Sequence, residues 1–395
     1  MSKCLIALVV TLALLLSLGV VPVMAQGETE VGTTAVVTGG TTTPPIIKCK
    51  WEQDQSGVLE AGDPVHARAG SQFLPPLAYQ NTTPVEFWVV VTDPDGVETV
   101  KQVEVQVWHP QGAPDPYGID QPNYFKYQVI LEKVDKFGVG IPAYEAARDA
   151  GLVTYQSGYT DTEVMDELTK CTAEVYRGEA VLDYHQPAGW IDPYDETAPG
   201  GYKVVADACD NGNAWASSAE TDLENYFEYL PGSGMEIDFG SVDYGTVEVC
   251  FNKWIAGDTV FEEPAGVGVA GPAAGQVRAT VRNIGNVEIE LMVAQDDMGF
   301  GFSGVGPPLP EDWNVVYDIR LGNDPANEVV YYPYKKAADP DPAVIPMVKL
   351  PNKLNLCQTE EIDLSIHVIK AKPDVTTYGG KMILGYEAIQ TMVSM

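Results

Sequence analysis

The sequence predicts a mainly β protein with two β-sandwich domains and a helical insertion in the first domain. Short runs rich in β-branched and aromatic residues recur along the chain, and Gly, Pro, Asn and Asp residues separate them. The length of 395 residues exceeds what one hydrophobic core usually organises, which favours two domains. One stretch in the first half has the periodicity of helices instead.

The first residues have the three parts of a secretory signal peptide. Lys3 precedes an apolar run over residues 5–21, and small residues lead up to Ala25. The run is short for a spanning helix and breaks at Pro22. We therefore expect a signal peptide over 1–25 that is cleaved after Ala25. The mature protein is expected to be secreted, extracellular or at the cell surface, with no membrane-spanning segment left.

The chain is strongly acidic, with 56 Asp and Glu against 23 Lys and Arg and a net charge of −33. Nucleic acid is excluded as a partner, because its phosphates would be repelled over the whole surface. A disordered acidic chain is the alternative explanation of this charge. A hydrophobic content of 45%, with seven Trp and twenty Tyr, favours a packed fold instead.

Residues 26–45 form a Thr- and Gly-rich N-terminal segment with paired prolines, which is typical of a tether. One part of it is β-branched and uncharged. We expect this part to act as a detached strand that adds to the sheet edge of a neighbouring subunit. The strand-exchange residues are Thr33, Thr34, Ala35, Val36, Val37 and Thr38.

The first domain is predicted over residues 46–231. A strand over 85–92, a turn over 93–96 and an alternating strand over 97–107 indicate a β-hairpin. A later strand over 199–209 leads through an acidic turn to Ala214-Trp215-Ala216.

A helical insertion is predicted at about 142–178. Tyr144 to Ala150 form a short helix candidate, and Thr160 and Glu163 have the spacing of a capping box. An apolar stripe follows, and we expect it to pack on the sandwich; a recognition helix is the alternative. The stripe contains Val164, Leu168, Cys171 and Val175.

The second domain is predicted over residues 234–386, followed by a tail over 387–395. Its strands are short and are separated by turn residues. The strands are expected at 235–242, 245–251, 276–293 (two strands about the turn at 283–286), 361–368 and 378–384.

These strand motifs resemble known extracellular modules. Residues 199–209 resemble a closing strand of Ig-like and PKD-like modules. The motifs at 238–242, 281–287, 362–368 and 377–384 resemble those of secreted archaeal surface and envelope proteins with Ig-like β-sandwich domains. They are similar, more loosely, to TasA-type extracellular filament subunits. The resemblance covers about the last 150 residues and includes no catalytic motif.

The resemblance implies two Ig-like β-sandwich domains with a helical insertion in the first, and a place in an S-layer, filament or sheath. The sequence departs from the pattern at the helical insertion and at the Pro- and Asp-rich stretch over 331–346.

Five cysteines remain after cleavage of the leader, and an exported protein permits disulfides. The partition between the two domains predicts a disulfide between Cys250 and Cys357. The pairing of Cys49, Cys171 and Cys209 stays open.

Two acidic loops have the oxygen ligands that calcium prefers, so calcium is the one candidate cofactor. The alternative is that Asp, Asn and Gly occupy these turns for backbone reasons. Asn81 begins an N-glycosylation motif. The candidate calcium ligands are Asp93, Asp95, Asp207, Asp210, Asn211 and Asn213.

The sequence contains no HExxH, GxSxG or phosphate-binding loop motif, and we therefore expect no enzymatic activity. The leading hypothesis is a secreted structural or assembly protein of the cell surface or of an extracellular filament or sheath. Self-association or other surface proteins are the expected partners. An extracellular glycan- or ligand-binding protein, with Trp190 in an aromatic loop, is the alternative. A secreted hydrolase is the third.

Overall fold

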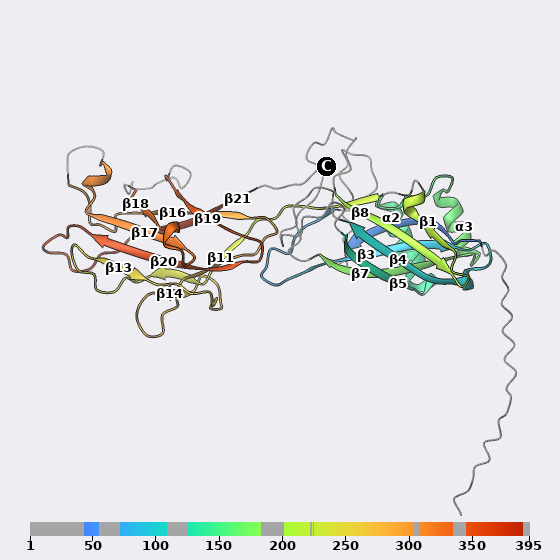
Figure 1. Cartoon of the computed structure of the whole chain (residues 1–395), viewed down its shortest axis with the longest axis horizontal. Helices are drawn as coiled ribbons and strands as arrows, with labels where there is room; N and C mark the ends of the chain where they lie inside the picture. Colours follow the sequence, from blue (N-terminus) through green and yellow to red (C-terminus); the bar gives the residue numbers. More distant parts are fainter. Residues whose placement is uncertain are drawn as a thin grey trace, which may run out of the picture. The chain divides into compact units, whose positions relative to one another are not determined.

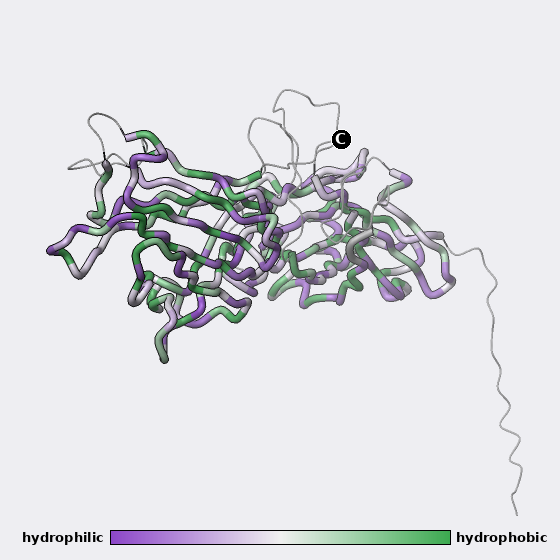
Figure 2. Tube along the Cα trace, turned by 60° about the vertical axis from the view of Figure 1, so that its left-hand side comes forward, coloured by the Kyte–Doolittle hydropathy of each residue, from purple (hydrophilic) through white to green (hydrophobic). Residues whose placement is uncertain are grey.

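The chain is mainly β, as predicted from the sequence (Figure 1). The computed structural model describes residues 43–54, 72–108, 125–182, 201–221, 223, 225–303, 308–334 and 345–389. The predicted leader, the Thr33–Thr38 strand and the Trp190 loop lie outside these residues. Hydrophobic and hydrophilic residues alternate in short segments along the strands (Figure 2).

The first half of the described chain, which we call the N-terminal β region, is one continuous ladder. Its order is β2-β10-β8-β4-β5-β7-β3-β1-β6, and β9 pairs with β8. The strands are β1 (Ile46–Asp54), β2 (Gln72–Phe73), β3 (Thr83–Thr92), β4 (Val100–Trp108), β5 (Phe125–Lys133), β6 (Thr154–Tyr155), β7 (Ala173–Leu182), β8 (Tyr202–Asp210), β9 (Trp215–Ser217) and β10 (Asn225–Tyr229).

The ladder folds back on itself, so that its two halves share one core. Phe87 of β3 packs in the same buried cluster as Val105 of β4 and Phe227 of β10. Neighbouring residues of β3 point the other way: Trp88 and Val90 belong to a second cluster. Both faces of β3 are therefore buried, which explains its nearly continuous apolar sequence.

Two helices cover this second face beside β1 (Figure 1). Helix α2 (Ile141–Asp149) has a proline in its first turn, and α3 (Asp161–Thr169) follows the predicted capping box. The Glu163 carboxylate accepts a hydrogen bond from the Thr160 backbone N–H at 2.8 Å. Among the residues that the structure describes, neither helix has the length and apolarity needed to cross a bilayer.

The predicted helical stripe is too long. Val164 and Leu168 are buried beneath α3 as expected, but Cys171 is exposed with a φ of 60° and Val175 lies in strand β7. The left-handed residue ends the helix, and the chain turns back into the sheet.

The predicted hairpin over 85–107 is also wrong in its pairing. Its two strands exist as β3 and β4, and the Gly96 N–H bonds the Asp93 carbonyl in the expected turn. However, β3 pairs with β1 and β7, whereas β4 pairs with β5 and β8. The short turn therefore carries the chain from one layer to the other.

The second half of the described chain, the C-terminal β region, contains three sheets. Their orders are β11-β15-β20-β17-β18 with β13 on β20, β12-β14, and β19-β16-β21. The strands are β11 (Met235–Ile237), β12 (Phe239–Val242), β13 (Asn252–Ile255), β14 (Gly268–Ala270), β15 (Thr280–Asn283), β16 (Ile289–Gln295), β17 (Val315–Leu321), β18 (Val329–Tyr331), β19 (Val348–Leu354), β20 (Thr359–Val368) and β21 (Met382–Ala388).

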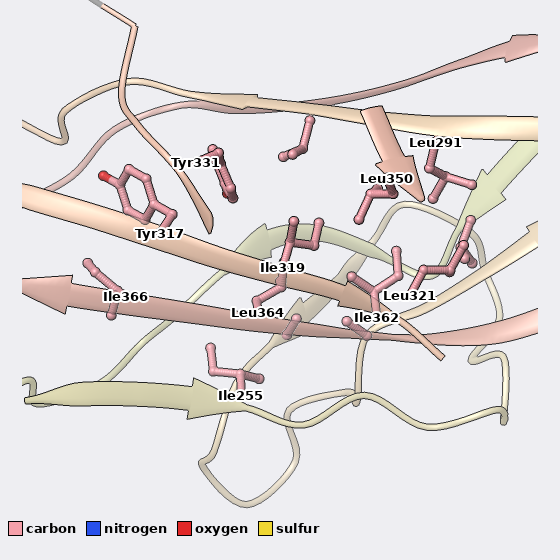
Figure 3. Packing of buried hydrophobic residues seen from close by; sticks show 14 of the residues in the cluster. Ile255, Leu291, Tyr317, Ile319, Leu321, Tyr331, Leu350, Ile362, Leu364 and Ile366 are labelled. Atoms are coloured by element: carbon pink, nitrogen blue, oxygen red, sulfur yellow. The ribbon is translucent and has the colours of Figure 1, made fainter. Parts of the chain in front are cut away.

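Alternate side chains of these strands form one buried cluster. Figure 3 shows side chains of this cluster, among them Ile319 of β17, Leu364 of β20 and Leu350 of β19. Tyr317 is fully buried, and its hydroxyl donates a hydrogen bond to the Asp296 carbonyl at 2.8 Å. The buried hydroxyl thus has a partner.

The two strands expected within 276–293 are present as β15 and β16, and they belong to different sheets. Two other expectations for this region need correction. Residues 245–251 form turns instead of a strand, because Gly245 and Cys250 both have positive φ angles. Strand β21 continues to Ala388, beyond the expected start of the tail at 387.

Candidate functional site

An open sheet edge beside a cavity is the main candidate site. Among the described residues, β21 pairs only with β16, and none of its seven residues is fully buried. Its Met382 and Leu384 side chains pack partly on the core and also line a cavity of about 400 Å³. The edge backbone of such a strand can pair with another strand.

The opposite wall of this cavity comes from β11 and β12. Ile237, Phe239 and Tyr244 supply apolar surface, while Gln295 and Lys381 supply polar groups. Burial raises the pKa of Tyr244, so its hydroxyl stays neutral. The cavity offers both apolar and polar surface to an entering side chain, and β21 forms part of its lining.

A second cavity, of about 430 Å³, is acidic. Asp258, Asp324, Glu360 and Glu361 contribute carboxylates, and Asn352 contributes an amide. Burial and the neighbouring Asp363 raise the pKa of Glu361. This chemistry favours a polar ligand that carries positive charge.

The structure brings the two predicted calcium loops together. The Asn211 backbone N–H bonds the Thr99 carbonyl at 2.8 Å, which ties the second loop to the end of the first. Asp93 and Asp210 are both buried, and each holds one carboxylate oxygen to which no described protein group donates. Their other oxygens accept backbone N–H groups of Asp95 and Ala214.

The other predicted calcium ligands serve different contacts. The Asp95 carboxylate accepts a hydrogen bond from the Thr43 backbone N–H. The Asn213 side-chain oxygen accepts one from the Lys101 ammonium group. The Asp207 carboxylate accepts one from the Gln106 side-chain amide. Burial raises the pKa of Asp207. Within the described ranges, no group of three or more His, Cys, Asp or Glu side chains has the arrangement of a metal site. A cation here therefore needs backbone or amide oxygens as further ligands.

We expect calcium to stabilise the N-terminal β region through Asp93 and Asp210, because a cation would satisfy their buried oxygens. At a free calcium concentration ten times the dissociation constant, the free energy of unfolding should rise by about 1.4 kcal/mol. Thermal melts with calcium and with magnesium measure this gain, and Asp210→Asn should remove it. The exposed Asp374→Asn is the control. An identical melt with and without calcium would contradict the prediction.

The predicted Cys250–Cys357 disulfide is wrong in this fold. The Cys250 N–H bonds the Val368 carbonyl at the end of β20, whereas Cys357 lies just before β20 begins at Thr359. Ten strand residues separate these ends by roughly 30 Å. A disulfide requires Cα atoms within about 7 Å.

The three cysteines of the N-terminal β region do not meet in a disulfide either. Cys49 is buried beneath the helices, and burial raises the pKa of its thiol. Cys209 is buried in β8, where its thiol contacts the Asp210 carbonyl at 3.3 Å. Cys171 is exposed at the turn after α3.

Asn81 is exposed just before β3, so the predicted glycosylation motif lies at the surface. The cavity beside β21 was not predicted from the sequence. Its lining residues come from segments far apart in the chain. The strand motifs at 238–242 and 377–384 marked two of these segments, but not that they meet.

Comparison with known proteins found no matching family model, and no curated protein matches the sequence.

Proposed function

We propose that this protein is a secreted, non-enzymatic assembly subunit of a cell surface or extracellular filament, and that its two β regions are Ig-like sandwich domains. The open edge of β21 beside a cavity that is lined in part by apolar side chains carries this proposal. The leader, the acidic composition and the strand motifs described above support it. Its partners are other copies of the chain or other surface proteins.

In this proposal, Thr33–Thr38 of one subunit adds to β21 of the next. The segment has no charge, and all of its residues except Ala35 are β-branched. Backbone pairing with β21 would supply affinity, and the cavity would take side chains such as Val36 from alternate positions. Strand addition needs a row of free backbone groups and space for side chains, and β21 offers an edge and a cavity that is partly apolar.

Deletion of residues 27–45 is expected to abolish assembly and leave a folded monomer, because β1 begins only at Ile46. Sedimentation and negative-stain microscopy of the mature protein measure the loss. Leu384→Lys should also block assembly, because it places a charge at the cavity. The control is Val330→Lys on the other edge strand, β18, where Val330 is already exposed.

A peptide covering residues 30–41 should bind the variant that lacks residues 27–45. It should not bind the same deletion variant when this also carries Leu384→Lys. Assembly that persists in the deletion variant would contradict the strand-exchange step. Wild-type protein that stays monomeric at all concentrations would contradict the assembly function.

Ligand binding is the second candidate, and the acidic cavity favours it. Its carboxylates suit an amino sugar or another cationic polar molecule. A glycan array that includes amino sugars tests this function, with Glu360→Gln as the variant. Retained binding in this variant would exclude the cavity as the site.

A further inference from the structure

Three polar side chains meet in the interior of the N-terminal β region. Lys50 and Glu52 lie two residues apart on β1, and Asn225 is the first residue of β10. Their exposed fractions are 1%, 1% and 2%. Charged residues are almost never this buried unless they are paired, so the cluster needs an explanation.

The contacts place an amine, an amide and a carboxyl group next to one another. The Lys50 Nζ donates to the Asn225 Oδ1 and, at 2.6 Å, to the Val204 carbonyl. The Asn225 Nδ2 donates to the Glu52 Oε2 at 2.7 Å. Asn225 therefore bridges the other two groups, with its carboxamide carbon beside the lysine amine.

The surroundings of this cluster are apolar. Lys50 pairs in register with Val89 and Glu52 pairs with Phe87, and both of these belong to the main core. Val204, which pairs with Asn225, belongs to the same core. An amine in such a place loses the hydration of its charged form, which favours the neutral, nucleophilic form.

Glu52 is suited to transfer protons here. Burial raises the pKa of its carboxyl group, and the contacts with Lys50 and Asn225 offset part of this rise. A neutral carboxylic acid can protonate a developing oxyanion, and its carboxylate can then accept a proton from nitrogen. The Asn225 Nδ2 donates a hydrogen bond directly to the Glu52 carboxyl group. The Lys50 amine donates a hydrogen bond to the oxygen of the same Asn225 carboxamide.

We propose that Lys50 and Asn225 react to form an intramolecular isopeptide bond, with Glu52 as the catalytic acid and base. The bond would join the first long strand of the region to its last. This inference does not depend on whether the protein assembles.

The reaction needs no co-reactant. The lone pair of the neutral Lys50 Nζ attacks the Asn225 Cγ, and the carbonyl electrons move to Oδ1, which takes the proton of Glu52. The Glu52 carboxylate removes a proton from Nζ and delivers it to Nδ2. The carbonyl then reforms, its hydroxyl proton returns to Glu52, and the Cγ–Nδ2 bond breaks with its electron pair. The products are one amide bond and one molecule of ammonia.

The bond would close a loop between positions 175 residues apart. It would remain intact when the sheet unfolds, and would thereby restrict the unfolded chain as a disulfide does. Unlike a disulfide, it would resist reduction, and it would connect strands from the two ends of the ladder.

Intact-mass spectrometry of the denatured full chain tests the proposal. The wild-type mass should be lower by one ammonia than the mass calculated from its sequence and any leader cleavage. Digestion should yield one branched peptide that contains both Lys50 and Asn225. Lys50→Met, Asn225→Ala and Glu52→Gln should each show the full calculated mass.

The surface contact between Lys101 and Asn213 is the matched control. Its Nζ–Oδ1 distance is 2.8 Å, but the contact is exposed, so Lys101→Met should leave the ammonia loss unchanged. Ammonia loss that maps to the Asn211-Gly212 step in place of the branched peptide would overturn the proposal. A wild-type chain of full mass would also overturn it, whether or not the variants fold. Cross-linking that persists in Glu52→Gln would overturn the role of Glu52.

Discussion

Trp51→Ala is expected to destabilise the N-terminal β region by about 3–5 kcal/mol. The Trp51 ring is fully buried between the sheet and the helices. It stacks on Trp88 with ring centroids 5.5 Å apart, and Tyr144 of α2 packs against its edge. Removal of the indole leaves a cavity at the contact that holds α2 on β1.

Chemical denaturation measures this loss, and hydrogen–deuterium exchange locates it. Amides of α2 and α3 should exchange faster in the variant, whereas those of β20 should keep their protection. The matched control is Trp215→Ala, because Trp215 is a tryptophan of the same region with half of its surface exposed. Equal losses in the two variants would show that the helices do not depend on the buried ring.

Tyr317→Ala should have an effect of similar size on the C-terminal β region, again about 3–5 kcal/mol. Tyr317 lies on β17, between β20 and β18, and packs against Tyr331, with ring centroids 5.5 Å apart. The substitution removes the ring from the core. It also leaves the Asp296 carbonyl without the hydrogen bond from the hydroxyl.

Tyr317→Phe separates these two contributions, because it keeps the ring and should cost only about 1 kcal/mol. Tyr332→Ala is the control, since Tyr332 is exposed next to β18. Urea denaturation followed by fluorescence measures all three variants. A Tyr317→Phe variant as unstable as Tyr317→Ala would mean that the hydrogen bond, and not the packing of the ring, dominates.

Local patterns in the sequence located many individual elements. Thr160 and Glu163 predicted the start of α3, because a capping box depends on residues three positions apart. The alternation of apolar and polar residues in 361–368 predicted β20, because side chains on a strand alternate between its two faces. The end of α3 at Thr169 was missed, because a cysteine such as Cys171 seldom adopts the positive φ angle that it has in the turn after the helix.

Local patterns in the sequence did not predict which strands pair with each other. The short Asp93–Gly96 turn predicted a hairpin, yet β3 and β4 lie in different halves of the ladder. Likewise, Cys250 and Cys357 share a region of sequence but lie at opposite ends of β20. Pairing depends on which apolar faces meet, and this is set by contacts between residues distant in the chain.

By itself, the sequence determined the mainly β character of the protein, its acidity and the positions of most strands, because these depend on composition and on spacings of a few residues. Only the tertiary structure decided that Lys50, Glu52 and Asn225 meet. Lys50 and Asn225 lie 175 residues apart, and the folding of one ladder back on itself brings their strands together. The same holds for the cavity beside β21, whose lining comes from three segments of the C-terminal β region that lie far apart in the chain.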